Sequence, residues 1–232
     1  MTKLTLSKRL SLIASMVEKD AVIADVGCDH ALLDIYLSQN KIIKRSIASD
    51  VAKGAIKQAE NNIKISNVDN VETRLGDGLE TIKETDEVST IVISGLGSQK
   101  IISILKSNIN KIKNVSSLII QANTGYKNIR KEVTKLGYYV SDEALVKERD
   151  IIYVVIKFKR GRRKYNRRQL FFGPVLLTKK DELFNEMIKA MIEKNNDILR
   201  KLPNKMLIRK FKLNINNNKL KKEIQESVKN FV

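Results

Sequence analysis

The sequence contains little of the chemistry that builds disulfides or metal centres. Among 232 residues there is one cysteine, Cys28, and one histidine, His30. A single cysteine excludes an internal disulfide and a cysteine-based metal cluster, and it fits a reducing compartment. One histidine and one cysteine among scattered carboxylates also lack the ligand spacing of a metal site, so we expect no metal.

Long apolar runs are missing as well. The sequence has no stretch of about twenty apolar residues, which argues against a transmembrane helix. Residues 1–17 carry Lys3, Lys8 and Arg9 among periodic leucines and have neither the apolar core nor the cleavage site of a signal peptide. We therefore expect a cytoplasmic protein that does not bind membranes.

Positive charge is in large excess and is unevenly distributed. The formal net charge is +18, and residues 160–232 hold 20 Lys and Arg against 7 Asp and Glu. An AT-rich genome would enrich lysine without a functional cause, but it would not favour arginine. One short segment, called here the basic cluster, comprises Lys159, Arg160, Arg162, Arg163, Lys164, Arg167 and Arg168. Because the guanidinium fork matches phosphate geometry, this cluster favours a polyanion such as RNA over a merely solvated face.

Short apolar runs alternate with amphipathic segments through most of the chain. One face of an opening helix is apolar, formed by Leu6, Leu10, Ile13, Ala14 and Val17. Strands are predicted at 22–25, 46–49, 71–75, 90–94 and 118–121, with helices at 30–39, 52–65, 99–112 and 127–136. This alternation predicts a parallel sheet with right-handed crossovers. Two further strands, 138–146 and 151–158, follow without a helix and predict a terminal antiparallel hairpin.

The order of these elements favours one fold class. Five parallel strands followed by an antiparallel hairpin are typical of class I methyltransferases, whereas a dehydrogenase would more often add a sixth parallel strand. We therefore expect an α/β fold with a Rossmann-like class I methyltransferase domain over residues 1–160.

The remaining residues, 161–232, have a different pattern. Apolar residues recur there at three- and four-residue steps, which predicts a basic, coiled-coil-like helical hairpin. A dimeric coiled coil is the alternative, but the intrachain hairpin is simpler, so we expect a monomer. The polar stretch 214–218 weakens the prediction of one long continuous second helix.

The turn after the first predicted strand is the most informative part of the sequence. The strand ends at Asp25, and Gly27, Cys28, Asp29 and His30 lead into the next predicted helix. In open α/β sheets, ligands bind at the carboxyl ends of the strands. One glycine rather than three lets a ligand approach but cradles a pyrophosphate poorly, which favours S-adenosylmethionine over a dinucleotide.

Three more predicted strand ends carry acidic, serine or glycine residues. They are Asp50 with Val51, then Asp77 with Gly78, and last Ser94, Gly95 and Gly97. The first carboxylate is placed to bind ribose hydroxyls, the second to accept a hydrogen bond from an adenine amino group, and the glycines to let a flat substrate lie against the backbone. Each is weak alone, because Asp and Gly are ordinary loop residues. Together, each at a strand end, they predict a cofactor site.

Several strings in the chain resemble a known family. They are Leu6-Ser7-Lys8-Arg9-Leu10, Ala24-Asp25-Val26-Gly27-Cys28-Asp29-His30-Ala31, Gly76-Asp77-Gly78-Leu79, Gly95-Leu96-Gly97 and Phe172-Gly173-Pro174. They look like the bacterial tRNA (adenine-N1)-methyltransferases that act at position 22 of tRNA, the TrmK family, and the resemblance covers nearly the full chain. It implies S-adenosylmethionine as cofactor, S-adenosylhomocysteine as product and tRNA as partner. Two residues depart from the family pattern: Cys28 stands where serine is expected, and Ala122 where proline would rigidify the turn before Asn123.

The implied chemistry suggests a role for Asp29. Methylation at N1 of adenine requires an unpaired base beside the methyl sulfonium. Positive charge passes to the ring as the methyl transfers, and a facing carboxylate stabilises that charge and can accept the proton of the exocyclic amine. We expect Asp29 to be this catalytic carboxylate. From the residues alone, a cap on the helix that begins at His30 is equally compatible, and only the resemblance favours catalysis.

The other expected roles concern binding. We expect His30 and Cys28 to line the cofactor pocket, since base N-methylation needs no covalent intermediate. Arg9 is expected to reach the substrate or the cofactor carboxylate, with a surface salt bridge as the alternative. Asn123 and Tyr126 lie where a contact with the target base would originate. The tRNA phosphates would be bound by the basic region, including Arg160, Arg162, Arg163, Arg167 and Arg168.

Two other functions compete with methyl transfer. A nicotinamide-dependent oxidoreductase would use Asp50 on its ribose, but the turn lacks the phosphate-binding glycines. A non-enzymatic RNA-binding protein on a methyltransferase scaffold could keep the pocket without turnover.

Overall fold

The computed structural model describes residues 4–203 and 206–229, and the chain divides into two compact units, Met1–Leu177 and Thr178–Val232. Residues 1–3 of the first expected domain, and 204–205 and 230–232 of the second, lie outside the described part. The first unit combines a sheet with helices, and the described part of the second unit is mainly helical.

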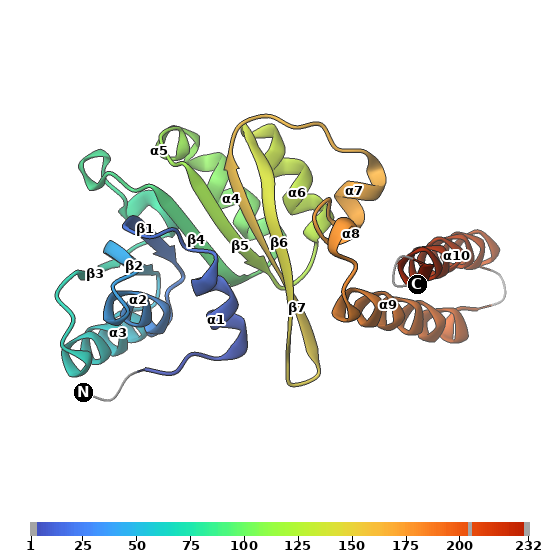
Figure 1. Cartoon of the computed structure of the whole chain (residues 1–232), viewed down its shortest axis with the longest axis horizontal. Helices are drawn as coiled ribbons and strands as arrows, with labels where there is room; N and C mark the ends of the chain where they lie inside the picture. The colour runs from blue at the N-terminus through green and yellow to red at the C-terminus, as the bar shows by residue number, and fades with distance from the viewer. Residues whose placement is uncertain (1–3, 204–205, 230–232) are drawn as a thin grey trace. The chain divides into compact units, whose positions relative to one another are not determined.

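The first unit is built on one seven-stranded sheet with the order β3-β2-β1-β4-β5-β7-β6 (Figure 1). Its strands are β1 (Ala21–Val26), β2 (Ile43–Asp50), β3 (Val71–Leu75), β4 (Thr90–Leu96), β5 (Ser117–Ala122), β6 (Tyr138–Glu148) and β7 (Ile151–Arg160). The first five strands pair in parallel, and β7 pairs antiparallel with both β5 and β6. The predicted parallel sheet with a terminal antiparallel hairpin is confirmed, and every predicted strand lies within an observed one.

Helices cover both faces of this sheet. They are α1 (Lys8–Ser15), α2 (Leu32–Gln39), α3 (Lys53–Ser66), α4 (Ser98–Ser107), α5 (Ile109–Ile112), α6 (Tyr126–Lys135), α7 (Arg167–Phe172) and α8 (Leu176–Lys179), with short 3-10 turns at Gly78–Thr81 and Glu84–Asp86. On one face, Leu33 and Leu37 of α2 and Ile13 of α1 pack with Ile23 of β1 in a single apolar cluster. Helices α4 and α6 contact each other on the opposite face (Figure 1).

The helix predicted at 99–112 is interrupted. The structure divides it into α4 and α5 at Asn108, whose backbone leaves the helical region and whose side-chain amide donates a 3.0 Å hydrogen bond to the carbonyl of Ile104. Asparagine competes with the backbone for hydrogen bonds in this way, so a purely apolar periodicity overestimated the helix.

The strand register places the two ends of β7 at opposite edges of the sheet. Val155 pairs with Gln121, close to the carboxyl end of β5, whereas Lys159 pairs with Ser117, where β5 begins. Residues 151–154 therefore extend beyond the carboxyl edge of the parallel strands, and Arg160 lies at the amino edge. Because ligands bind at the carboxyl edge, this register decides which basic residues can approach them.

A buried ion pair anchors the segment that follows the sheet. Nε of Arg130 in α6 donates to Oε1 of Glu143 in β6 at 2.6 Å, and both side chains are essentially inaccessible. Nη1 of Arg130 also donates to the carbonyls of Leu170 and Phe171 at the end of α7, and Glu143 accepts from the backbone N–H of Val175. The pair thus provides hydrogen-bond partners for backbone carbonyls at the end of α7 and for a backbone N–H just before α8.

The Phe172-Gly173-Pro174 string is explained by this ion pair. Gly173 has a φ of 103°, and a Cβ added there would lie 2.5 Å from Oε2 of Glu143 and 2.8 Å from Nη2 of Arg130. Only glycine fits, because the backbone conformation and the close approach both exclude a side chain.

The two compact units divide at 177/178, whereas the sequence predicts a domain boundary at 160/161. The first compact unit continues to Leu177, because α7 packs against α6 and is tied to the buried pair of Arg130 and Glu143. The basic cluster consequently belongs to the sheet-containing unit. The abrupt change from strand to helix pattern near residue 160 is a change of secondary structure within the first compact unit.

The second unit contains a helical hairpin. It pairs α9 (Glu182–Lys201) with α10 (Leu207–Lys229), and buries Phe184, Ile188 and Leu220. The polar stretch 214–218, which weakened the prediction of one continuous second helix, does not interrupt α10. Asn217 exchanges 2.8 Å hydrogen bonds with Asn195 and Asn196 of α9. A polar stretch can thus remain helical when its amides find partners across the hairpin.

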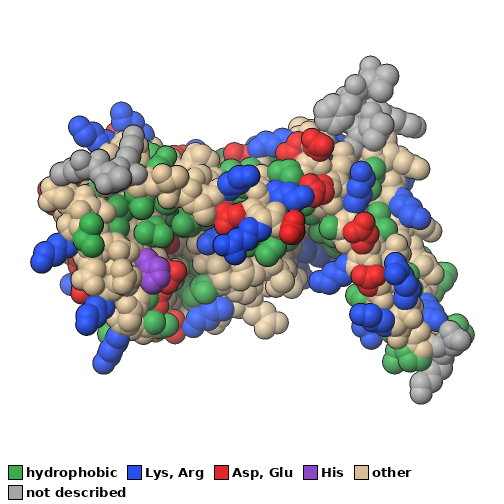
Figure 2. Space-filling model, turned by 90° about the horizontal axis from the view of Figure 1, so that it is seen from below, with side chains coloured by type: hydrophobic (Ala, Val, Ile, Leu, Met, Phe, Trp, Pro, Cys, Tyr) green, Lys and Arg blue, Asp and Glu red, His purple; other side chains and the backbone are tan. Residues whose placement is uncertain are grey.

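Charge is mixed on the surface seen in Figure 2. Lys and Arg side chains on that face are interspersed with acidic side chains, and they do not gather in one continuous patch. Among the described residues, no helix is long and apolar enough to cross a membrane.

Candidate cofactor and substrate site

The turn after β1 is built from residues in left-handed conformations. Gly27 has a φ of 76°, and a Cβ added there would meet nothing within 4 Å, so the turn has open space in front of it. The N–H groups of Gly27 and Cys28 both donate to the carbonyl of Ser49, at 2.8 and 3.0 Å, which ties the turn to β2. A ligand could therefore approach the backbone of this turn closely.

Asp29 is not a helix cap. Helix α2 begins at Leu32, its capping residue is Ala31, and no side chain caps it. Asp29 has a φ of 53°, and its side chain is 78% exposed, with Oδ1 3.5 Å from Nε2 of His30. The structure thus removes the capping alternative and leaves the carboxylate presented at the mouth of the turn.

Asp50 is held in place by backbone donors. Its Oδ1 accepts from the N–H of Ala52 at 2.9 Å, and its Oδ2 accepts from the N–H of Asp29 at 3.3 Å. The carboxylate at the end of β2 is therefore oriented before any ligand binds, and it connects the β1 turn to the second strand end.

Asp25 is buried at the base of the same turn, beside a second buried carboxyl, Asp34 of α2. Burial, followed by the negative charges of Asp34 and Asp50, raises the pKa of Asp25 well above its ordinary value. Burial and these same carboxylates also raise the pKa of the Cys28 thiol. A thiol kept neutral in this way is a poor nucleophile, which agrees with the expectation that Cys28 has no covalent role.

These residues enclose a cavity of about 270 Å³ at the carboxyl edge of the sheet. The predicted site residues that line it are Arg9, Asp25, Gly27, Cys28, Asp29, His30, Asp50, Ser94 and Gly95. Four residues that the sequence did not single out complete the lining: Leu10, Leu32, Leu33 and Leu96. The cavity combines an acidic floor with apolar walls, as a nucleoside-like ligand with a charged end requires.

Gln121 joins two walls of the cavity and was missed as a functional residue. Its Oε1 accepts from the N–H of Gly95 at 3.0 Å and from Nη1 of Arg9 at 2.9 Å, and its side chain is fully buried. The backbone of Arg9 donates to Glu148 at 2.8 Å, and its guanidinium lies 5.7 Å from the ring centroid of Tyr153. An uncharged polar side chain at the end of an apolar strand was the available signal, and it follows the same strand-end rule that selected Asp50.

Apart from the arginines of the basic cluster, six predicted site residues do not line this cavity. They are Val51, Asp77, Gly78, Gly97, Asn123 and Tyr126. Asp77 forms an ion pair with Lys100, whose Nζ lies 3.1 Å from both carboxylate oxygens. Gly78 is required for packing, because a Cβ there would lie 3.0 Å from the side chain of Ile104.

Asn123 nonetheless stays next to the site. Its Nδ2 donates to the carbonyl of Gly95 at 2.7 Å, and its N–H donates to the carbonyl of Leu96 at 2.9 Å. These two bonds hold Asn123 although Ala122 replaces the proline of the family pattern. Tyr126 opens α6 and is half-buried, and burial raises the pKa of its hydroxyl.

The predicted phosphate-binding arginines lie away from the cavity. Arg160 ends β7 at the amino edge, where its guanidinium stacks 5.1 Å from the ring of Tyr138, and Arg163 lies 4.9 Å from the ring of Tyr139. Arg162 is exposed between them, and Arg167 and Arg168 open α7. The structure does not bring these side chains together with Asp29, because β7 runs antiparallel to β5 and carries them to the opposite edge.

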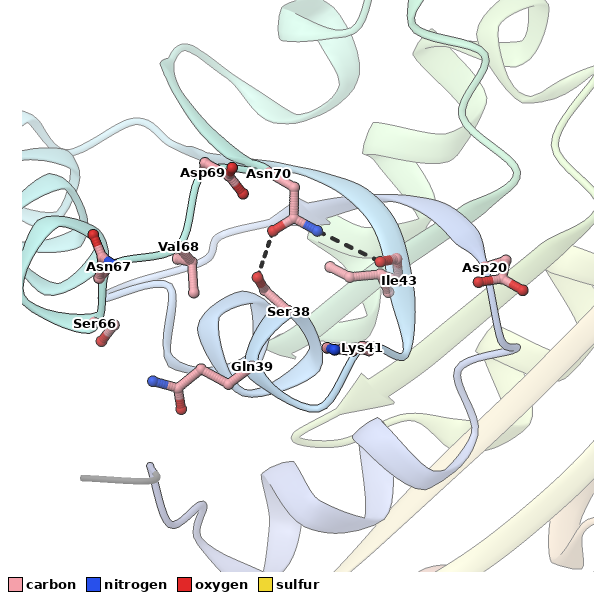
Figure 3. Close-up of a pocket in the computed structure, with 10 residues that line it drawn as sticks. All are labelled: Asp20, Ser38, Gln39, Lys41, Ile43, Ser66, Asn67, Val68, Asp69 and Asn70. Carbon is pink, nitrogen blue, oxygen red and sulfur yellow. Dashed lines mark hydrogen bonds between the residues drawn. The ribbon is translucent and has the colours of Figure 1, made fainter. Parts of the chain in front are cut away.

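A larger cavity, about 610 Å³, lies where β1, β2 and β3 begin (Figure 3). In Figure 3, Asn70 hydrogen-bonds Ser38 and the carbonyl of Ile43, so these polar groups satisfy one another. Size alone does not make it a functional site, because ligands of open α/β sheets bind at the other edge. Among the described residues, no group of three or more His, Cys, Asp and Glu side chains could hold a metal ion.

Comparison with known proteins assigns the family. The model of the family "tRNA (adenine(22)-N(1))-methyltransferase", TrmK, matches residues 23–230. The chain belongs to this family. The resemblance seen in the sequence strings is thereby confirmed.

Individual relatives agree with the family match. The chain is 34% identical over 164 residues to the tRNA (adenine(22)-N(1))-methyltransferase of Bacillus subtilis, covering 70% of this chain and 68% of the relative. It is similar to the solved structure of Streptococcus pneumoniae Sp1610 in complex with S-adenosyl-L-methionine, at 30% identity and a TM-score of 0.88, covering 95% of this chain and 100% of that one. Mycoplasma capricolum TrmK in complex with S-adenosyl-homocysteine is 29% identical, with a TM-score of 0.84 and coverage of 95% and 98%.

Proposed function

We propose that this protein transfers a methyl group from S-adenosylmethionine to N1 of the adenine at position 22 of tRNA. The observation that carries this function is the family match over residues 23–230, in a chain whose carboxyl-edge cavity is lined in part by three of the five strings that resemble the family. The oxidoreductase hypothesis loses its support, since the turn after β1 offers one glycine and an acidic floor where a pyrophosphate would sit.

The residues of the cavity fit the cofactor. Gly27 and Gly95 both face open space, so a flat ligand can lie against their backbones, and Asp50 presents a carboxylate already oriented by two N–H donors. Asp25 adds a buried carboxyl oxygen, Oδ1, that has no hydrogen-bond donor among the described residues. When bound, S-adenosylmethionine supplies an electrophilic methyl group on a sulfonium and leaves as S-adenosylhomocysteine.

We propose that Asp29 is the catalytic residue. Its exposed carboxylate stands beside the cofactor turn, and its left-handed backbone holds it outside α2. A carboxylate here can stabilise the positive charge that develops on the adenine ring and accept a proton from the exocyclic amine. Arg9, Asn123 and Tyr126, at or beside the rim, are proposed to orient the base, and orientation supplies much of the rate in such a displacement.

The phosphates of tRNA are proposed to bind basic side chains outside the cavity. Arg162, Arg163 and Arg167 of the basic cluster are exposed in the first unit, and α10 of the second unit exposes Arg209, Lys212 and Lys219. Phosphate contacts position a large RNA while a separate pocket reads one base, so they need not lie at the carboxyl edge. We also propose that the enzyme acts as a cytoplasmic monomer, because α9 and α10 pair within one chain and bury Phe184, Ile188 and Leu220 there.

The direct test is incubation with unmodified bacterial tRNA and labelled S-adenosylmethionine, followed by digestion and identification of the labelled nucleoside. We expect the label in 1-methyladenosine, at position 22. Label in another nucleoside would contradict the assignment of atom and site while keeping the cofactor. Bound cofactor without any label would favour the non-enzymatic RNA-binding scaffold.

The basic cluster can be tested by removing three charges at once. We expect Arg162→Gln with Arg163→Gln and Arg167→Gln to weaken tRNA binding and to reduce the slope of log affinity against log salt by about 2–3, since each lost phosphate contact accounts for about 0.7–0.9. KM for tRNA should rise, with kcat little changed. The matched control replaces Lys53, Lys57 and Lys64 of α3, which are exposed and lose the same charge. An equal change of slope in both triple variants would mean that net charge, and no particular surface, attracts the RNA.

A further inference from the structure

Two buried carboxyls lie together beneath the cofactor cavity. Asp25 of β1 is 4% exposed, and Asp34 of α2 is fully buried. Side chains two apart on a strand point to the same face, so Asp25 faces the side on which Ile23 packs against Leu33 and Leu37 of α2. Asp34 stands on that same helix, at a position whose neighbours in the sequence, Leu33 and Ile35, are both buried and apolar.

The hydrogen bonds around these carboxyls are incomplete. Oδ1 of Asp34 accepts from the hydroxyl of Ser46, which is itself buried. Neither Oδ1 of Asp25 nor Oδ2 of Asp34 has a hydrogen-bond donor among the described residues, and both carboxyls lie on the face of β1 that α2 covers. Buried polar atoms are almost always satisfied. A proton on one carboxyl, donated to the other, would satisfy both oxygens at once.

The surrounding charges favour that single proton. Two ionised carboxylates in contact, away from water, repel strongly, and paired acids elsewhere share one proton for this reason. Asp50 adds a third negative group, Arg9 is the cation that acts on Asp25, and the thiol of Cys28 stays neutral. Burial raises the pKa of Asp34 as well as that of Asp25, so both members of the pair resist full ionisation.

We propose that Asp34 is a positioning residue of the cofactor pocket, which shares one proton with Asp25 and makes the pair release that proton when a cationic ligand binds. The inference rests on the proposed function, because it takes S-adenosylmethionine to be the ligand. On binding, the hydrogen-bonded acid and carboxylate become two carboxylates, and the proton passes to the solvent. The sulfonium charge of the substrate favours this ionisation, and S-adenosylhomocysteine lacks that charge.

The pair therefore discriminates substrate from product through protons. Because the bound state holds fewer protons than the unbound state, affinity rises with pH, by at most about tenfold per pH unit for one proton. The rise is steeper for S-adenosylmethionine than for S-adenosylhomocysteine. His30 and Asp29 also face the cavity, so the experiment must separate His30 from the pair.

Calorimetric titration tests this inference with the whole chain. Binding of S-adenosylmethionine and of S-adenosylhomocysteine is measured from about pH 6 to about pH 9, in two buffers of different ionisation enthalpy, which counts the protons released. We expect the wild-type protein and His30→Gln to release more protons with S-adenosylmethionine than with its product. Asp34→Asn should lose this difference, because its amide donates permanently to Asp25 and no proton remains to be released.

Other outcomes are equally informative. A purely structural role of Asp34 would change both affinities equally at every pH, and that result overturns the inference. Equal proton release with both ligands in the wild-type protein overturns it too, even if Asp34→Asn fails to fold. Loss of the difference in His30→Gln assigns the proton to the histidine instead. If S-adenosylmethionine does not bind at any pH, the proposed function itself fails, which is a distinguishable result.

Discussion

Asp29→Ala is expected to lower the turnover of tRNA methylation by about 10²–10⁴-fold while leaving cofactor affinity nearly unchanged. The Asp29 side chain is exposed at the mouth of the turn, and the residue contacts Asp50 only through its backbone N–H. Removing the side chain therefore leaves the proposed cofactor-binding carboxylates in place. The measurement is single-turnover methylation of tRNA, together with calorimetric binding of S-adenosylmethionine.

Two variants control this experiment. Asp20→Ala removes another aspartate in a left-handed conformation, with a φ of 60°, at the other end of β1, and it should leave turnover unchanged. Asp29→Asn keeps the shape and tolerates the same backbone, so it separates the loss of charge from the loss of the side chain. Full turnover in Asp29→Ala would exclude the carboxylate from catalysis. An equal loss of turnover in Asp20→Ala would mean that placing alanine in a left-handed backbone conformation, and not the loss of the Asp29 carboxylate, lowers turnover.

Gly173→Ala is expected to destabilise the first unit by about 3 kcal/mol, because the new Cβ would press into a buried ion pair. The atoms nearest to that Cβ would be the two carboxylate oxygens of Glu143 and Nη2 of Arg130. Both side chains are buried and are hydrogen-bonded to the end of α7 and the start of α8. For a chain of this length, such a loss lowers the melting temperature by about 6–12 °C. Thermal unfolding followed by circular dichroism measures it.

Gly54→Ala is the matched control for this substitution. Gly54 lies in α3, a Cβ added there meets nothing within 4 Å, and its φ is not in the left-handed region. Alanine should therefore be neutral or stabilising by up to about 1 kcal/mol. An unchanged melting temperature in Gly173→Ala would mean that the segment after β7 is not anchored through Arg130 and Glu143.

Strand ends were the most reliable guide to the site. Asp25, Asp50 and Gly95 were selected because each stands at the end of a predicted strand, and the parallel register brings all three to one cavity. The rule works because parallel strands align their carboxyl ends, so local sequence is enough to place such residues at one edge. Asp77 also comes to this edge at the end of β3, where it pairs with Lys100 and is not part of the cavity lining.

Gln121 and Asp34 show what local patterns miss. Each is a polar residue in an apolar element, and its role depends on partners far along the chain: Arg9 and Gly95 for Gln121, Asp25 for Asp34. A short segment of sequence does not show whether a polar side chain will be buried with hydrogen-bond partners or exposed to solvent.

The amino-acid order alone specified the alternation of strands and helices, the terminal hairpin, the edge at which the polar strand ends meet, and the family. These features depend on periodicity and on neighbouring residues, which are local properties of the chain. The position of the basic cluster was decided by packing. An antiparallel β7 carries Arg160 to the amino edge, and the buried pair of Arg130 and Glu143 keeps residues up to Leu177 in the first unit. Both depend on contacts between residues distant in sequence, and such contacts form only when the strands and helices pack together in the folded chain.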